Sequence, residues 1–261
     1  MSYPPSINVW HVYPQGGLSL LCRHLASDLG DVIKLQSPVE AILVESSRVA
    51  GISVQGRVEE VSAVISTAPV TVLAKMVRGT DVLNYLYRFR YRPMVFANLK
   101  FKGRKLLPDV VLWTPERKFL FFRLTETPLS MPWLAPDGDT IITADIGCEV
   151  VDDVWNADNA ALTELCLEAM GPIVSDARTR FSGCHVLRSP LAYPIFLNEY
   201  EVERRGFESG TGIDGLYSIG RNGEFAHLLT EDVYWRTLRK MRDVLAFLET
   251  PSPVKSLHEL L

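Results

Sequence analysis

The residues that most clearly suggest chemistry form a glycine-containing turn near the carboxyl end of the chain. The turn Gly220-Arg221-Asn222-Gly223 follows an apolar run at 216–219 that is typical of a short strand. A helix with Thr230 as its N-cap is expected to follow, and its apolar stripe is expected to be buried: Tyr234, Leu238, Met241, Leu245 and Leu248. A strand that runs into small residues lets backbone amides approach a ligand closely. The N-terminus of the following helix favours electron-rich atoms. The pattern predicts a ligand-binding turn, although an ordinary strand-to-helix turn of an α/β domain has the same appearance.

A literal G-x-G-x-x-G motif lies just before this strand, at Gly210-Thr211-Gly212-Ile213-Asp214-Gly215. In a phosphate-binding loop, a strand precedes this motif and a helix opens from it, so that the helix N-terminus meets the phosphates. Here a charged stretch at 198–208 precedes the motif and a strand follows it. We therefore interpret these glycines as a flexible turn that leads into the strand.

The elements near the amino end are expected in a definite order. Tyr13-Pro14-Gln15-Gly16-Gly17 precedes an amphipathic helix with an apolar stripe, which ends at Gly30 and is followed by a short strand at 32–35. Strands at 39–45 and 49–54 are separated by Ser46-Ser47-Arg48, which indicates a hairpin. A third strand at 61–66 runs into Ser66-Thr67-Ala68-Pro69, and a helix follows at 72–77.

This order of segments resembles the rear part of the amine oxidase and protoporphyrinogen oxidase-like FAD proteins, which include UDP-galactopyranose mutase-like members. The resemblance rests on Tyr-Pro-x-Gly-Gly, Pro38-Val39-x-x-Ile42, Val-Ile-Ser-Thr-Ala-Pro and Leu216-Tyr217-x-x-Gly-Arg in that order. It implies a mixed α/β (α+β) fold with a partial FAD-binding, Rossmann-like domain and a mixed-sheet substrate domain. The first domain would comprise 1–80 and 206–261, and the second would comprise 81–205.

The resemblance also implies which residues contact FAD. Val39 would meet the adenosine end through its backbone, Gly220 and Arg221 would lie by the pyrophosphate, and 222–228 would face the flavin. The full implied set is Gly16, Gly17, Val39, Ser66, Thr67, Ala68, Gly220, Arg221, Asn222, Gly223, Phe225 and Leu228. Gly16 and Gly17 also fit a simple helix start, and Val39 also fits a core strand residue.

The middle of the chain is rich in aromatic residues. Strands are expected at 91–102, 110–114, 119–125, 140–146 and 178–187, and a helix is expected at 159–170. Such aromatics could line a substrate pocket, although large apolar side chains are more often core. By the resemblance, Tyr193 sits over the flavin, so it is the first substrate-facing candidate, and Arg188 is a candidate anion anchor.

Direct catalytic candidates are few. Tyr193 and His227 are the two to consider, and His227 fits either proton transfer or a hydrogen-bonded structural role. The five histidines show no metal-ligand spacing, and no Gly-x-Ser-x-Gly elbow is present. The four cysteines have no C-x-x-C spacing, and their mostly apolar neighbours favour buried thiols.

Composition excludes several classes of partner. The net charge of -4 and the scattered Lys and Arg residues argue against nucleic-acid binding. No apolar run approaches the roughly 18 residues that span a bilayer, and the amino end does not read as a signal peptide. We therefore expect a cytoplasmic protein with a small-molecule substrate.

The sequence lacks a G-x-G-x-x-G loop between a strand and a helix ahead of these segments, although FAD proteins of this type begin with one. We expect either a fragment of a larger flavoprotein or a truncated relative, with weak or no FAD binding by this chain alone. Apolar surface left uncovered is expected to favour a homo-oligomer or association with the missing half. Two functions remain open: the C-terminal part of an FAD-dependent oxidoreductase, or a flavin-free binding module. A mutase-like flavoprotein that acts on a nucleotide sugar without net redox change is a variant of the first. The substrate could be an amine, a tetrapyrrole, a polyene or a sugar.

Overall fold

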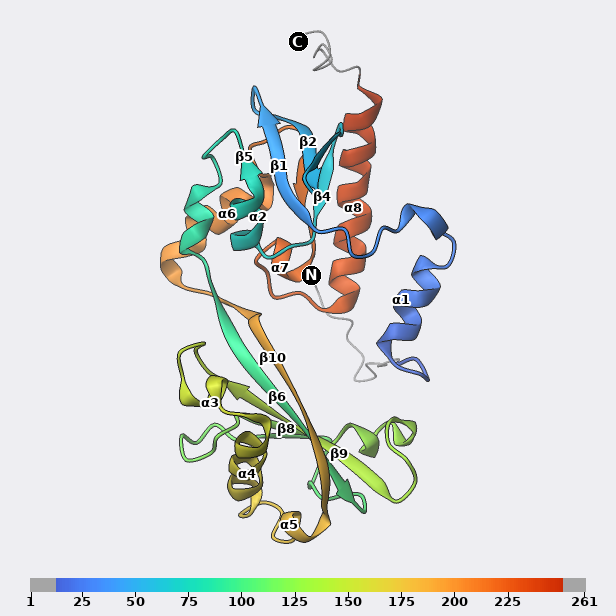
Figure 1. The fold of residues 1–261 in the computed structure, drawn as a ribbon, viewed down its shortest axis with the longest axis vertical. Helices are drawn as coiled ribbons and strands as arrows, with labels where there is room; N and C mark the ends of the chain where they lie inside the picture. Colours follow the sequence, from blue (N-terminus) through green and yellow to red (C-terminus); the bar gives the residue numbers. More distant parts are fainter. Residues whose placement is uncertain (1–12, 251–261) are drawn as a thin grey trace, which may run out of the picture. The chain divides into compact units, whose positions relative to one another are not determined.

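A computed structural model describes residues 13–250 (Figure 1). The chain divides into two compact units. We call Met1–Leu35 with Met94–Ser189 unit 1, and Gln36–Pro93 with Pro190–Leu261 unit 2. The boundary falls within two long strands, β6 (Arg90–Lys102) and β10 (Phe181–Ile195). Helices combine with antiparallel and parallel strand pairs, which gives the mixed α/β class that the sequence predicted.

Unit 2 begins with the predicted hairpin. β1 (Val39–Glu45) pairs with β2 (Arg48–Val54), β2 pairs with β3 (Arg57–Glu60), and β5 (Val77–Arg78) lies parallel to β1. Ser46 and Ser47 both have positive φ, at 49° and 62°, and Gln55 and Gly56 have 52° and 71°. Two consecutive residues with positive φ make tight turns whose twist matches that of the flanking strands. Both turns are therefore two-residue hairpin turns.

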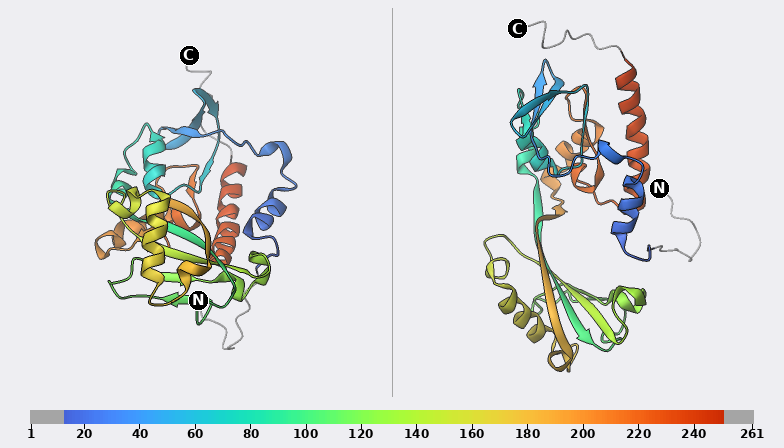
Figure 2. Two further views of the ribbon diagram at one scale, coloured as in Figure 1. Left: turned by 60° about the horizontal axis from the view of Figure 1, so that its bottom comes forward. Right: turned by 45° about the vertical axis from the view of Figure 1, so that its right-hand side comes forward.

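The second part of unit 2 is a small parallel sheet with helices around it. β4 (Val64–Ser66) pairs with β11 (Leu216–Ser218). The helices are α2 (Val70–Met76), α6 (Glu201–Ser209), α7 (Gly220–Gly223) and α8 (Thr230–Glu249), with 3₁₀ turns η2 (Asn84–Arg88) and η5 (Asn198–Tyr200). α8 runs beside this sheet (Figures 1 and 2), where its Lys240 donates to the carbonyl of Ser218 and its Phe247 ring meets Tyr217.

Unit 1 is built on a five-stranded sheet in the order β10-β6-β9-β8-β7, with β9 (Asp139–Gly147), β8 (Arg123–Thr125) and β7 (Val111–Trp113). α4 (Asn159–Met170) covers one face of the sheet (Figure 2). Leu162 and Cys166 of α4 belong to the same buried core cluster as Ala97 and Ala144 of the sheet. The remaining elements are α1 (Leu18–Ala26), α3 (Asp153–Asn156), α5 (Ala177–Arg180) and the 3₁₀ turns η1 (Gly30–Val32), η3 (Thr127–Leu129) and η4 (Pro132–Leu134).

Several expected elements differ in the structure; for example, 178–180 lies in the helix α5 and not in the strand expected at 178–187. The segment 32–35 forms no strand, because it continues from η1 into an irregular turn. The charged stretch 198–208 is mostly helical, as η5 and α6, whereas the sequence had suggested a linker. Glu201 accepts from Arg204 and Arg205 at helical spacings, and such pairs stabilise a polar helix.

The predicted burial of the last helix is wrong. Among the described side chains of α8 only Val244 is buried, while Leu238 is 42% exposed and Leu245 is 54% exposed. Tyr234 and Leu248 are also exposed, and Met241 is half-buried. A sheet of two strands is too narrow to cover the whole apolar stripe. Thr230 is also not the N-cap of this helix. The N-cap residue is Leu229, and its backbone N–H donates to Asp232 Oδ2.

Candidate functional site

Two of the predicted ligand-binding turns lie side by side in unit 2. β4 and β11 are parallel with Ser66 opposite Ser218, so the turns that follow them leave the same edge of the sheet. The Ile219 N–H donates to the Ser66 carbonyl at 2.9 Å. A Cβ on Gly223 would lie 3.4 Å from the Ser66 oxygen and 3.5 Å from that of Ala68, which shows how closely the turns approach. Parallel strands and a small residue therefore bring Ser66-Thr67-Ala68 and Gly220–Gly223 together.

Tyr91, on β6, holds these turns to the start of α2. Its hydroxyl accepts from the Val70 N–H at 3.1 Å and donates to the Asn222 carbonyl at 2.8 Å. The Tyr91 ring meets the edge of Phe225 at 5.3 Å between centroids. Burial raises the pKa of the Tyr91 phenol to about 12. One side chain thus satisfies a helix N-terminal donor and fixes the backbone of the glycine turn.

The buried carboxylate of Glu224 holds the backbone of the same turn. Glu224 is 2% exposed, and its Oε1 accepts from the Gly220 N–H at 3.3 Å. Its Oε2 accepts from Arg236 Nε at 2.8 Å and lies 3.7 Å from Lys240 Nζ. Burial lowers the pKa of the Lys240 amine, and Glu224 opposes that shift. Arg236 also donates to Glu208, which holds the pKa of that carboxyl below its ordinary value.

The glycine turn itself presents polar atoms that the protein does not satisfy. Arg221 Nε and Asn222 Oδ1 are buried and have no hydrogen-bond partner among residues 13–250. The Arg221 guanidinium lies 5.2 Å from the centroid of the Tyr193 ring, so two predicted site residues meet. Gly220 has φ of +86°, and nothing lies within 4 Å of where its Cβ would be. A buried polar group without a partner is costly, so the turn fits a ligand that supplies the missing partners.

Other predicted residues of unit 2 take different places. Phe225 is fully buried among Phe89 and Tyr91, so only its backbone is left to line a site. Leu228 is half-buried beyond the turn and His227 is exposed. Val39 is the first residue of β1, opposite Val54. The structure brings together Ser66–Ala68, Gly220–Gly223 and Tyr193, whereas Val39 belongs to the other sheet of unit 2.

Three predicted site residues, Gly16, Gly17 and Arg188, belong to unit 1. Gly16 and Gly17 have φ of 101° and 85° in the turn before α1. Arg188 donates to the carbonyls of Trp155 and Ala157 and to Asn159 Oδ1. Its guanidinium therefore clamps the loop that enters α4, and its role as an anion anchor stays a prediction.

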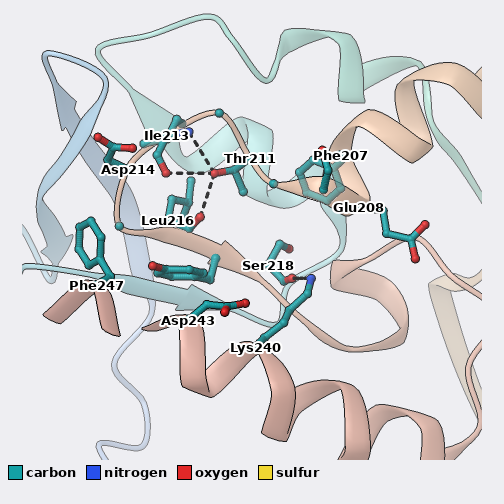
Figure 3. Close-up of a pocket in the computed structure, with 15 residues that line it drawn as sticks. Phe207, Glu208, Thr211, Ile213, Asp214, Leu216, Ser218, Lys240, Asp243 and Phe247 are labelled. Atoms are coloured by element: carbon teal, nitrogen blue, oxygen red, sulfur yellow. Dashed lines mark hydrogen bonds between the residues drawn. The ribbon is translucent and has the colours of Figure 1, made fainter. Parts of the chain in front are cut away.

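A cavity of about 350 Å³ lies next to the site, between α6, β11 and α8 (Figure 3). The segment 210–215, which holds the literal glycine motif, forms one wall. Thr211 closes that segment by donating to the Leu216 carbonyl at 2.8 Å. Tyr217, Lys240 and Asp243 line other parts of the cavity. Burial, with Asp243 and Asp214 adding to it, raises the pKa of Tyr217.

Within residues 13–250, no group of three or more His, Cys, Asp or Glu side chains could hold a metal ion. Over the same residues, no helix is long and apolar enough to cross a membrane.

The fold is that of an α/β protein in which two turns lie together at the carboxyl edge of a parallel strand pair. Residues 8–222 match the family of flavin containing amine oxidoreductases, and the chain belongs to that family. The sequence-based resemblance to amine oxidase-like proteins is thereby confirmed. A comparison with curated proteins finds no match.

Solved structures share the fold. A reduced UDP-galactopyranose mutase superposes with a TM-score of 0.71 at 17% identity, covering 90% of this chain and 52% of its own. A protein assigned as a protoporphyrinogen oxidase from Exiguobacterium sp. 255-15 gives 0.72 at 15% identity, with 90% and 52% covered. A putrescine oxidase variant gives 0.69 at 13% identity, with 88% and 53% covered. The chain spans about half the length of these structures.

Sequence reasoning missed Tyr91 and Glu224, which organise the site. Glu224 follows the glycine turn directly, and an acidic residue in that place, with a cation twelve residues on in the next helix, is a signal that could have been used. Tyr91 carries no such signal, because its partner Asn222 lies 131 residues away in the chain.

Proposed function

We propose that the chain is the C-terminal portion of an FAD-dependent oxidoreductase and that its paired turns hold part of the FAD. The observation that carries the proposal is the pair of buried, unpartnered polar atoms on Arg221 and Asn222, at the turn that the family resemblance assigns to the cofactor. Family membership supports the flavin. The proposal includes a cytoplasmic location for the protein and a small molecule as its substrate.

In this proposal each residue has a definite task. Arg221 donates to the pyrophosphate, and Tyr193 keeps its guanidinium oriented by packing against it. Ser66, Thr67 and Ala68 offer backbone groups on the opposite side. Tyr91 and Glu224, working from beneath the turn, hold it in shape so that it need not be ordered on binding. When bound, FAD supplies the capacity to accept a hydride, and the protein orients the substrate against it.

The domain assignment is part of the same proposal. The cofactor-binding domain comprises residues 1–80 and 206–261, and the substrate-binding domain comprises residues 81–205. Gly16, Gly17, Val39, Phe225 and Leu228 stay in the proposed cofactor set through their backbones, with Tyr193 as the first candidate to face the substrate. Because the chain spans about half the length of the structures that it matches, we propose that further polypeptide completes the FAD site.

One alternative within the family is a mutase-like flavoprotein that acts on a nucleotide sugar. The match to a UDP-galactopyranose mutase favours it. Another alternative is a binding module without flavin. The complete burial of the Phe225 side chain favours it, because only the backbone of that residue is left to line a site.

Absorbance spectroscopy tests the proposal. The purified chain is titrated with FAD and followed between about 350 and 500 nm, where bound flavin absorbs. A saturable change in the flavin bands is expected for the wild type, and Arg221→Gln should weaken it about tenfold, the typical effect of one charged hydrogen bond. Arg239→Gln, on the exposed side of α8, is the matched control. A titration that Arg221→Gln leaves unchanged would contradict the assignment of the turn. A folded chain that does not bind FAD would mean either that the further polypeptide is essential for the FAD site or that the chain is the flavin-free module.

A further inference from the structure

Unit 1 contains a row of side chains that the proposed cofactor site does not use. In the sheet, Phe96 is opposite Asp145, Asp145 is opposite Arg123, and Arg123 is opposite Trp113. Directly opposed residues project from the same face of a sheet. These four residues therefore form one row across β6, β9, β8 and β7. Neighbouring positions such as Ala144 point to the other face and pack against α4.

Arg123 is the centre of this row. Its Nη2 donates to Asp145 Oδ2, and its guanidinium lies 5.3 Å from the Trp113 ring centroid and 6.0 Å from that of Phe122. Trp113 and Phe122 stack on each other at 6.0 Å. Arg123 Nε is buried and has no hydrogen-bond partner among the described residues. The guanidinium is thus fixed in place, with donor capacity that the protein does not use.

The row changes from buried to exposed along its length. Asp145 is 2% exposed, while Trp113 at the far end is 60% exposed. Burial raises the pKa of the Asp145 carboxyl, and Arg123 opposes that shift. A buried ion pair contributes little net stability, because desolvation offsets the attraction. Stability therefore does not explain why this sheet face keeps a charged pair beneath an exposed aromatic ring.

We propose that Arg123 and Trp113 form a binding site for a small molecule that has a flat unsaturated ring and an anionic oxygen, either carboxylate or phosphate. The ring lies against Trp113, whose exposed face suits offset stacking. The anionic oxygen accepts from the guanidinium, which matches planar carboxylate and phosphate groups. Asp145 acts as a positioning residue that holds the guanidinium in its plane. The interpretation of this row as a substrate site rests on the proposed function, in which this part of the chain binds the substrate.

The test uses the full chain and no FAD. Benzoate and phenyl phosphate are the probes, with benzyl alcohol lacking the anion and inorganic phosphate lacking the ring. Binding is measured by saturation-transfer NMR and calorimetry. Both probes are expected to bind, and Arg123→Gln and Trp113→Ala should each weaken them about tenfold, as the loss of one charged hydrogen bond or one stacked ring does. The matched controls are Arg117→Gln and Trp133→Ala, both exposed residues of unit 1, which should bind as the wild type does.

Several results would overturn the inference. One is the absence of binding by both probes. Another is equal binding of benzyl alcohol or of inorganic phosphate, which would remove the anion or the ring from the ligand. A third is full affinity in the Trp113→Ala chain, a surface change that leaves the buried ion pair intact if Arg123→Gln does not fold. Binding of only one probe decides between carboxylate and phosphate and supports the site. The FAD titration is an independent measurement. Probe binding without FAD binding supports this inference even if the proposed function fails. FAD binding without probe binding refutes this inference and leaves the proposed function intact.

Discussion

Replacing Tyr91 with phenylalanine tests whether one hydroxyl holds the glycine turn. The change removes the oxygen that accepts from the Val70 N–H and donates to the Asn222 carbonyl, and leaves the ring that packs on Phe225. Val70 is fully buried at the first turn of α2. Water cannot easily replace the lost partner there, so the N–H is left unsatisfied.

The expected loss follows from these two bonds. A buried donor left without a partner costs about 1–3 kcal/mol, and a typical hydrogen bond contributes about 1 kcal/mol. We expect Tyr91→Phe to lower the free energy of unfolding of unit 2 by about 2–3 kcal/mol. Tyr87→Phe is the control. The Tyr87 hydroxyl also bonds to α2, through the Ala74 carbonyl, but its side chain is half-exposed, so the expected loss is below about 1 kcal/mol.

The assay is urea unfolding followed by circular dichroism and by fluorescence. The midpoint should fall for Tyr91→Phe with no change in slope, because the same surface is exposed on unfolding. If Tyr91→Phe and Tyr87→Phe lose the same stability, the hydroxyl does not hold the turn and the reasoning fails.

The same residue predicts an alkaline effect. The pKa of Tyr91 is raised by burial from 10.0 to about 12 in the folded state. The neutral phenol is favoured by folding, so this contribution is fully present below pH 10 and is lost as pH rises through 10 to about 12. The wild type should lose stability over that window more steeply than Tyr91→Phe, in which this phenol is absent. Equal slopes for both chains would show that folding does not raise the pKa of this phenol, and would contradict the prediction.

Three further outcomes are expected. Glu224→Gln removes the buried carboxylate that pairs with the partly exposed Arg236 and Lys240, while Arg236 keeps Glu208, and should lower the stability of unit 2 by about 1.5–3 kcal/mol, measured by urea unfolding; a loss under 1 kcal/mol would contradict the structure. A thiol reagent should modify the exposed Cys22 quickly and Cys166 only on unfolding, because burial raises the pKa of Cys166 to about 12; rapid modification of both would be contrary to this. Leu238→Glu with Leu245→Lys should reduce any self-association of the chain seen by light scattering, because both side chains belong to the exposed stripe of α8, and an unchanged mass would place the contact elsewhere.

Local patterns in the sequence were enough to predict several elements of both units. The hairpin at 39–54 was predicted within one residue, because alternation of apolar side chains and a polar turn are local signals. The helix at 159–170 was predicted with its observed bounds, and Asp158 caps it by accepting from the Ala161 N–H. The two turns after β4 and β11 were also found, because small residues after a strand mark a backbone that must come close to something else.

The interactions that organise the site could not be found in this way. Tyr91 meets Asn222 only because β6 returns beside the glycine turn, and no local period records that pairing. Arg188 shows the reverse case, in which the charge suggested a ligand contact, while the structure adds three hydrogen bonds to nearby carbonyl oxygens that no local pattern indicated. The apolar stripe of α8 was correct as a pattern. Its burial was not, because a periodic stripe indicates which face is apolar and not what covers that face.

The glycines themselves show why context decides the meaning of a motif. Gly215, the last residue of the literal G-x-G-x-x-G, has φ of +77°, and a Cβ there would lie 2.7 Å from the Ser62 carbonyl oxygen. It is glycine because two backbone segments touch, which needs no ligand. Gly220 also has positive φ, but nothing lies within 4 Å of its Cβ position, and unpartnered polar atoms of Arg221 and Asn222 follow it. A glycine whose Cβ position is occupied by other protein atoms is required by the fold. A glycine that faces open space beside unsatisfied polar groups leaves room for a ligand.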